Sequence, residues 1–211
     1  MMSPDLISDG PQDAATTVVL AHGAGAGMDT PFMEAFAQGL AAQNLRVVRF
    51  EFPYMKKVRE TGRRRPPDRA PVLLQAWEAV IDGLDTGRLF IGGKSLGGRI
   101  ASMVADEKRV TGLICLGYPF HPPGKPDRLR TEHLQSLETP ALICQGSRDP
   151  FGTAEEVAQY GLPAGIRMHW LDDGDHSFKP RKRSGRSIEQ NWQEAIQATV
   201  DFINDINDLD R

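Results

Sequence analysis

The stretch Leu89-Phe90-Ile91-Gly92-Gly93-Lys94-Ser95-Leu96-Gly97-Gly98 decides how the rest of the sequence is interpreted. A short apolar run leads into a Gly-x-Ser-x-Gly sequence, and a helix-like segment begins near Leu96. A tight strand-to-helix turn with glycine two residues before and after a serine strains the serine backbone and exposes its hydroxyl. This context predicts that Ser95 is a nucleophile. The alternative is that Ser95 only caps the following helix.

A nucleophilic serine needs a base, and the base needs an acid that orients it. Asp149 follows one later apolar run, and His176 follows the next. Serine, acid and histidine in this chain order are typical of one class of parallel-sheet enzyme. We therefore predict that Asp149 is the acid and His176 the base. Asp149 as a plain Asp-Pro turn residue stays open, as do three rival carboxylates: Asp172, Asp173 and Asp175.

The other histidines are weaker candidates for the base. His169 lies within a predicted strand, and His133 is expected on a surface helix. His121 lies in a proline-rich loop and precedes the acid in the chain. His22 is expected to shape a turn by hydrogen bonding rather than to act as a base.

The glycine-rich loop from His22 to Gly27 supplies the rest of the predicted site. An oxyanion is stabilised by two N–H groups aimed at one point. We predict that the N–H groups of Leu96 and Ala24 form this pair. Further contacts with the substrate are expected from residues near the same loops: His22, Gly23, Gly25, Tyr54, Lys94, His121, Arg64 and Arg183.

Six short apolar runs alternate with segments of helical periodicity, which predicts an α/β fold with a mostly parallel sheet covered by helices on both faces. The predicted strands are Thr17–Ala21, Val47–Phe52, Leu89–Gly92, Gly112–Leu116, Ala141–Gln145 and Arg167–Leu171. The predicted helices are Pro31–Gln43, Pro71–Asp85, Leu96–Glu107, Ala154–Tyr160 and Ile188–Ile206. In such a sheet, the chemistry lies beyond the carboxyl ends of the strands.

Length and composition predict one globular domain over residues 1–211, with residues 1–15 as a flexible or edge segment. A net charge of -3 argues against nucleic acid as a partner. No apolar stretch approaches the roughly 20 residues of a membrane helix, so no membrane partner is expected. The polar segment Met1–Gln12 lacks a signal-peptide core, which favours the cytoplasm. Cys115 and Cys144 are expected to be buried and reduced, and a disulfide between neighbouring strands is the alternative.

Nucleotide, cofactor and metal sites are not expected. Met28 stands where a dinucleotide fingerprint needs its third glycine, and Arg88 stands where a phosphate-binding loop needs its first. No cluster of histidines, cysteines and carboxylates has the spacing of a metal site. The sequence therefore predicts chemistry without a cofactor.

Two loops that leave predicted strand ends are rich in basic residues. They contain Lys56, Lys57, Arg59, Arg63, Arg64, Arg65 and Arg69 in one loop, and Lys179, Arg181, Lys182, Arg183 and Arg186 in the other. These side chains are either ordinary solvated charges or an electropositive rim that attracts an anionic acyl substrate or an acidic partner.

Five motifs together resemble a family. They are His22-Gly-Ala-Gly-Ala-Gly-Met-Asp, Phe50-Glu-Phe-Pro-Tyr, Arg64-Arg-Pro-Pro-Asp, Gly93-Lys-Ser-Leu-Gly-Gly-Arg and Asp175-His-Ser-Phe. The sequence is similar from about Val18 to Ile203 to small bacterial α/β-hydrolases related to the testis-expressed hydrolase-like protein and to the hydrolase-like domain of a histone-acetyltransferase-complex subunit. It resembles dienelactone hydrolases more distantly, since those use cysteine where this chain has Ser95.

The resemblance implies an α/β-hydrolase fold of six to seven strands with little or no lid, and a triad of Ser95, Asp149 and His176. The expected function is that of a serine hydrolase that cleaves a carboxylic ester or thioester of a small molecule through an acyl-enzyme. An interaction module without turnover and an acyltransferase are the alternatives. The segment Phe120–Leu137 lies where a cap is common but is too short for a large lid, so we expect an open, shallow pocket.

Overall fold

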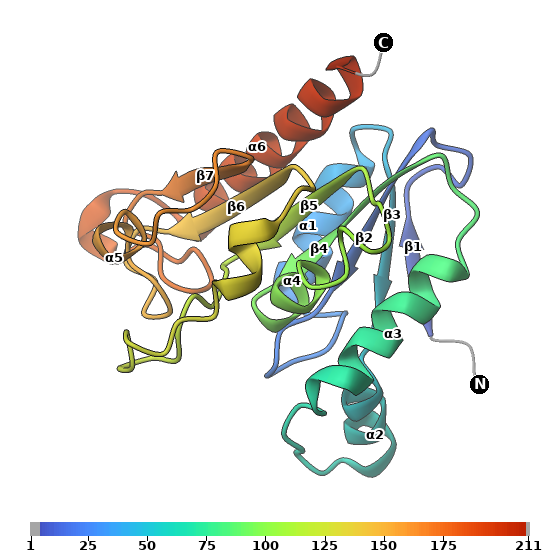
Figure 1. The fold of residues 1–211 in the computed structure, drawn as a ribbon, viewed down its shortest axis with the longest axis horizontal. Helices are drawn as coiled ribbons and strands as arrows, with labels where there is room; N and C mark the ends of the chain where they lie inside the picture. The colour runs from blue at the N-terminus through green and yellow to red at the C-terminus, as the bar shows by residue number, and fades with distance from the viewer. Residues whose placement is uncertain (1–4, 210–211) are drawn as a thin grey trace.

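The computed structural model describes residues 5–209 (Figure 1). Seven strands form one sheet in the order β1-β3-β2-β4-β5-β6-β7. β1 is antiparallel to β3 at one edge, and all other pairs are parallel. The strands are β1 (Leu6–Asp9), β2 (Thr16–Ala21), β3 (Arg46–Phe50), β4 (Arg88–Lys94), β5 (Gly112–Leu116), β6 (Ala141–Gly146) and β7 (Ile166–Leu171).

Helices cover both faces of this sheet (Figure 1). Because successive strand residues point to opposite faces, Val18 of β2 packs with α1 and α6 while its neighbour Val19 packs with α3 and α4. The α-helices are α1 (Pro31–Ala41), α2 (Pro53–Thr61), α3 (Ala70–Asp82), α4 (Leu96–Ala101), α5 (Ala154–Val157) and α6 (Ile188–Leu209), and the 3₁₀ helices are η1 (Glu132–Ser136) and η2 (Lys182–Ser184). The predicted mostly parallel, two-sided architecture is confirmed.

Several boundaries differ from the predicted ones. The strand β1 was not predicted, and it lies in the segment expected to be flexible or at an edge; residues 1–4 of that segment lie outside the described residues. The helix α2 was not predicted either; it begins with Pro53 and ends at Thr61, and the next residue, Gly62, has a left-handed φ of 65°. The helix α4 ends at Ala101 rather than Glu107, where the Ser102 hydroxyl donates to the carbonyl of Arg99.

The two cysteines lie on neighbouring strands but on opposite faces. Cys115 pairs in register with Ile143, and Cys144 pairs with Leu116. Cys115 therefore packs with the α3 and α4 side and Cys144 with the α1 and α6 side. Both are free thiols, as expected, and burial raises the pKa of each above its ordinary value.

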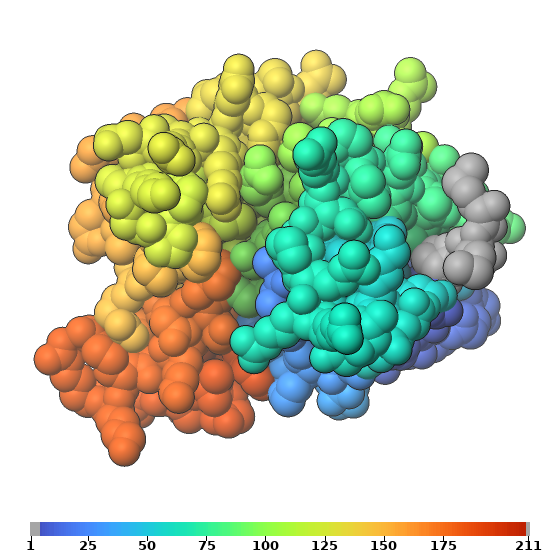
Figure 2. Space-filling model, turned by 90° about the horizontal axis from the view of Figure 1, so that it is seen from below, coloured from blue at the N-terminus to red at the C-terminus, as the bar shows by residue number. Residues whose placement is uncertain are grey.

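The parallel strands end level with one another at one edge of the sheet. Ala21 of β2 lies opposite Gly93 of β4, and Gly93 lies opposite Cys115 of β5. The loops that follow these strands therefore meet at this edge. In the view from below, Figure 2 shows a hollow between the cyan segment that contains α2 and the orange segment that follows residue 175.

Within residues 5–209, no helix is long and apolar enough to cross a membrane. The same range contains no group of three or more His, Cys, Asp or Glu side chains that could hold a metal ion.

Candidate active site

Ser95 lies at the sharp turn between β4 and α4. Its backbone has φ 50° and ψ -111°, a conformation that is rare for a residue with a side chain. The turn is closely packed, because a Cβ atom at Gly97 would lie 2.3 Å from the carbonyl oxygen of Ala21. The N–H of Ser95 donates to the carbonyl of Leu116 on the adjacent strand at 3.0 Å. The surroundings thus hold the strained serine in place with its hydroxyl at the strand edge.

The structure brings together the three side chains that the sequence places at separate strand ends. His176 Nε2 lies 2.9 Å from Ser95 Oγ. His176 Nδ1 lies 2.7 Å from Asp149 Oδ2. The order of serine, histidine and carboxylate is that of a proton-transfer chain to a nucleophile.

Asp149 is fully buried and held by several donors. One oxygen accepts the N–H of Phe151 at 2.9 Å, and the other accepts the Gln145 amide at 3.0 Å as well as His176. The rival carboxylates are engaged elsewhere or exposed: Asp173 pairs with Arg181 and Arg148, Asp175 accepts the N–H groups of Ser177 and Lys179, and Asp172 lies exposed.

Gln145 is a residue of this site that the sequence reasoning missed. It is fully buried at the end of β6. Its amide nitrogen lies within 3.2 Å of the carbonyl oxygens of Tyr118 and Gly152, and its oxygen accepts the Tyr118 N–H at 2.7 Å. The sequence does contain a signal for this role, because Gln145 is a polar residue at the end of an otherwise apolar strand. Gln145 ties Asp149 to two neighbouring segments.

His176 is arranged as a neutral base. Burial is the main reason that its pKa lies below the ordinary value; the hydrogen bond that His176 donates to Asp149 opposes this effect, and the charge of Lys94 adds to it. Since a carboxylate only accepts hydrogen bonds, the proton of neutral His176 belongs on Nδ1, and Nε2 is free to accept the Ser95 hydroxyl. The Phe151 ring packs on the imidazole, with 4.2 Å between ring centroids.

His22 shapes the glycine-rich loop, as expected from the sequence. It is fully buried, its Nε2 accepts the N–H of Phe52 at 3.1 Å, and its Nδ1 donates to the carbonyl of Gly23 at 2.7 Å. Burial lowers the pKa of His22, which agrees with the neutral form that these two contacts require. His22 thus ties the loop after β2 to the chain after β3.

Tyr54 holds the next part of the same loop. Its hydroxyl lies 3.3 Å from the carbonyl oxygen of Gly23 and 3.2 Å from that of Ala24. Tyr54 thus holds both carbonyl groups of this segment. Ala24, whose N–H is the predicted oxyanion donor, lines the same cavity as Ser95. Leu96 is the first residue of α4, and an N–H at that position has no acceptor within its own helix.

Ion pairs anchor the far end of the loop. Arg59 of α2 donates to Glu51 at 2.7 Å and to Asp29 at 2.5 Å, and Glu51 also accepts the N–H of Met28 at 3.2 Å. A Cβ atom at position 27 would lie 2.2 Å from the Glu51 carboxylate and 2.6 Å from the Arg59 guanidinium, so a larger residue there would displace this ion pair. These contacts give the unpredicted helix α2 a role: it fixes the loop that faces Ser95.

The family can be stated from comparison with known proteins. The family described as "Alpha/beta hydrolase domain" matches residues 14–204. The chain belongs to the alpha/beta hydrolase family. The predicted fold and the predicted enzyme class are thereby confirmed, whereas the narrower resemblance to the testis-expressed protein stays a prediction.

Solved structures share the fold of this hydrolase. An alpha-beta serine hydrolase homologue from Coxiella burnetii is 19% identical, with a TM-score of 0.71 over 92% of this chain and 90% of that one. A serine hydrolase without lid from Xanthomonas campestris is 18% identical, with a TM-score of 0.65 over 92% and 88%. A dienelactone hydrolase from Anabaena variabilis is 21% identical, with a TM-score of 0.64 over 93% and 97%.

A cavity of about 370 Å³ opens at Ser95 in this hydrolase. The loop Gly23–Gly27 forms one wall, and apolar side chains of Phe32, Met33 and Phe151 form much of the rest. His176 also lines the cavity. Among the described residues, none in the segment 120–137 reaches its wall, in agreement with the expected minimal lid.

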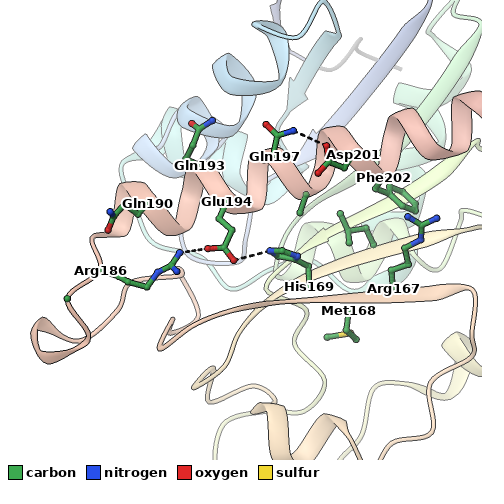
Figure 3. A pocket seen from close by; sticks show the side chains of 13 residues that line it. Arg167, Met168, His169, Arg186, Gln190, Gln193, Glu194, Gln197, Asp201 and Phe202 are labelled. Atoms are coloured by element: carbon green, nitrogen blue, oxygen red, sulfur yellow. Dashed lines mark hydrogen bonds and ion pairs between the residues drawn. The ribbon is translucent and has the colours of Figure 1, made fainter.

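A larger cavity of about 800 Å³ lies between β7 and α6 (Figure 3). Its charged side chains pair with one another: Glu194 contacts both Arg186 and His169, and Gln197 donates to Asp201 at 2.8 Å. Its lining contains no serine, cysteine, threonine or lysine. The larger cavity therefore lacks a hydroxyl, thiol or amine nucleophile, and the smaller one, which contains Ser95, is the candidate active site.

A second serine–histidine pair lacks the features of a site. His133 was expected on a surface helix, but it is half-buried in η1, with Nε2 2.8 Å from the hydroxyl of Ser102. Ser102 is only 3% exposed, and its hydroxyl donates to the carbonyl of Arg99. The imidazole of His133 contacts Tyr118 rather than a carboxylate.

The remaining predicted substrate contacts are spread over several environments. Lys94 lines the cavity, and its ammonium group contacts the main chain of His176. Tyr54 and His121 are buried, with 1% and 2% exposure, and lie outside the cavity wall; His121 faces Glu156 instead. Arg64 and Arg183 are exposed and form no ion pair with any described residue.

Proposed function

We propose that this protein is a serine hydrolase that cleaves a carboxylic ester or thioester of a small molecule through an acyl-enzyme. The observation that carries the proposal is the hydrogen-bonded chain from Ser95 through His176 to Asp149, at a strained strand-to-helix turn that opens into a cavity. This combination meets the geometric requirements for an activated nucleophile.

In the first half of the reaction, His176 Nε2 takes the proton of the Ser95 hydroxyl as Oγ attacks the substrate carbonyl. The N–H groups of Leu96 and Ala24 donate to the oxygen that becomes negative. His176 then gives its proton to the leaving alcohol or thiol, which departs and leaves the acyl group on Ser95. Asp149 stabilises the imidazolium that exists between these two transfers.

In the second half, a water molecule takes the place of the leaving group. His176 removes a proton from this water, whose oxygen attacks the acyl carbon. The bond to Ser95 breaks, Oγ recovers its proton from His176, and the acid leaves. Every proton is carried by His176, so the proposed reaction uses no cofactor and no metal.

The lining and the volume of the cavity favour a substrate with a small apolar acyl group. Its apolar walls come from Phe32, Met33 and Phe151, and its volume of about 370 Å³ is near the lower end of small-molecule sites.

The basic side chains of the two loops outside the cavity concern a different part of the substrate. Arg64 and Arg183 are exposed and form no ion pair within residues 5–209, which supports an anionic group on the part of the substrate outside the cavity. Other basic residues are already neutralised, since Arg59, Arg181 and Arg186 pair with carboxylates.

The first experiment is a screen of chromogenic esters and thioesters of graded acyl length with the wild-type protein and the Ser95→Ala variant. We expect turnover of short apolar acyl groups by the wild type only. Equal rates in both proteins would refute the proposed mechanism. A folded wild type that turns over no substrate would favour an interaction module, and transfer to added alcohols or amines in preference to water would identify an acyltransferase.

A second experiment tests the electropositive rim. Two esters that differ only in a carboxylate on the leaving group are compared at low salt, in the wild type and in Arg64→Glu and Arg183→Glu variants. We expect the wild type to prefer the charged ester and the variants to lose this preference. Equal catalytic efficiency for both esters in all three proteins would rule out the rim and leave the hydrolase proposal untouched.

A further inference from the structure

The side chain of Lys94, the residue before the nucleophile, is directed to the base rather than left free. Its ammonium group donates to the main-chain carbonyl of His176. The rings of Phe32 and Phe178 flank it, with their centroids 5.2 Å and 5.6 Å from Nζ. A cation held between aromatic rings and a carbonyl oxygen has a defined position.

Gly117, at the end of β5, makes this contact possible. It has a φ of 71°, and a Cβ atom at this position would lie 2.8 Å from Lys94 Nζ, 3.1 Å from the His176 carbonyl oxygen and 3.4 Å from His176 Nδ1. The ammonium nitrogen and the imidazole nitrogen are therefore at most about 6 Å apart. A side chain at position 117 would crowd both the lysine and the histidine and would strain the backbone.

The positive charge of Lys94 has no ion-pair partner in the part of the chain that the structure describes. No carboxylate of residues 5–209 lies within 4.0 Å of Nζ. The acidic groups that face it are Asp149, which is bound to His176 and Gln145, and Asp175, which accepts backbone N–H groups. Burial lowers the pKa of Lys94 to about 8, and these two carboxylates oppose the effect. At neutral pH the side chain still carries its charge for most of the time.

We propose that Lys94 is a positioning residue for His176: its ammonium group fixes the main chain of the base, and its charge favours the neutral imidazole that accepts the proton of Ser95. This inference rests on the proposed function for the role of His176 and deepens it. Asp149 and Asp175 favour the imidazolium, so Lys94 offsets two carboxylates. Without Lys94, His176 would take up a proton at a higher pH and cease to act as a base there.

The kinetic test compares Lys94→Met, which has no charge, with Lys94→Arg, which keeps it. The pH dependence of kcat/KM is measured with a neutral ester, so that substrate charge plays no part. A charge about 6 Å away changes a pKa by on the order of one unit. We expect the acid limb of the Lys94→Met profile to move upward by about that amount, and the limb of Lys94→Arg to stay near the wild-type position whatever rate it loses.

A second readout does not require turnover. The imidazole of His176 is titrated by NMR in the wild type and both variants, with the signal assigned by its loss in His176→Gln. An upward shift in Lys94→Met alone supports the proposal even if no substrate is ever found, which separates it from the hydrolase proposal. An unchanged titration in a folded Lys94→Met variant, or equal shifts in both variants, overturns it. Circular dichroism checks folding, and Lys94→Gln replaces Lys94→Met if the latter does not fold.

Discussion

The cavity at Ser95 and the cavity between β7 and α6 differ in the chemistry of their side chains as well as in size. The cavity between β7 and α6 holds about 800 Å³, and the one at Ser95 about 370 Å³ (Figure 3 shows the larger). In the larger cavity, acids and bases neutralise one another, as Glu194 does with Arg186. In the smaller one, a histidine and a carboxylate both serve a strained serine. Convergence of groups on one reactive atom, rather than volume, distinguishes the candidate site.

The origin of the residues explains this difference. The larger cavity is lined mainly by side chains of β7 and α6, together with Leu142 of β6 and the segment at Arg186. The smaller one is lined by loops that leave the ends of β2, β4 and β7, by the segment after β6, and by Phe32 and Met33 of α1. Loops from several strand ends bring together residues that are far apart in the sequence.

The largest effect is expected from Ser95→Ala, which removes the nucleophile. We expect kcat for a chromogenic ester to fall by at least about 10⁴-fold. The matched control is Ser136→Ala, an exposed serine of η1, which is expected to change kcat by less than about twofold. Similar losses in both variants would place the activity outside the smaller cavity.

The next largest effect is expected from Asp149→Asn. The amide cannot stabilise an imidazolium and favours the wrong tautomer of His176, so we expect kcat/KM to fall by about 10³- to 10⁴-fold. Asp172→Asn removes an exposed carboxylate four residues before His176 and should leave kcat/KM within about twofold. A larger loss in Asp172→Asn than in Asp149→Asn would show that the acid is misassigned.

A smaller effect is expected from Gln145→Leu. The buried groups of Tyr118, Gly152 and Asp149 would lose their partner, which should cost about 1–3 kcal/mol in the free energy of unfolding and about tenfold in kcat. Chemical denaturation and steady-state kinetics measure the two quantities. Gln197→Leu is the corresponding change in the larger cavity, and we expect it to alter stability by no more than about 0.5 kcal/mol.

The pH profile tests the state of the base. Because burial lowers the pKa of His176, its imidazole stays neutral to a pH below 6.5, and kcat/KM should fall only as the pH drops through that lowered pKa. The profile of a neutral ester between pH 4.5 and about 8 measures this limb. An acid limb above pH 6.5 would contradict the geometry described for His176.

The smallest effect is expected from Glu194→Gln in the larger cavity. The ion pairs of Glu194 with Arg186 and His169 are about one-third exposed, and such pairs contribute about 0–1 kcal/mol. We expect no more than about a twofold change in kcat/KM. Thermal unfolding measures the change in stability, and ester kinetics measure the change in kcat/KM. A tenfold loss of activity would mean that the two cavities are coupled.

The sequence predicted those parts of the molecule that local patterns determine. Continuous apolar runs marked the six parallel strands, and the Gly-x-Ser-x-Gly turn marked the serine. The edge strand β1 was missed because only its alternate residues are half-buried, over four positions. The helix α2 was missed because a dense basic composition concealed its amphipathic pattern, in which Tyr54 and Met55 are buried.

The contacts that support the site could not be read from local patterns. Gln145 acts through three groups that approach it only when β5, β6 and the turn at Gly152 are folded together. Arg59 was counted with the free charges of its loop, since nothing in the sequence shows that Glu51 and Asp29 lie beside it. Both residues owe their roles to tertiary neighbours.

Labelling by a fluorophosphonate tests the central claim most directly, because this reagent reacts with an activated serine and requires no knowledge of the substrate. Intact mass and peptide mapping should show one adduct per chain, on the peptide that contains Ser95. The adduct should be absent in Ser95→Ala and form far more slowly in His176→Gln. A folded wild-type protein that stays unlabelled, or an adduct that persists in Ser95→Ala, would contradict the assignment of Ser95 as the nucleophile.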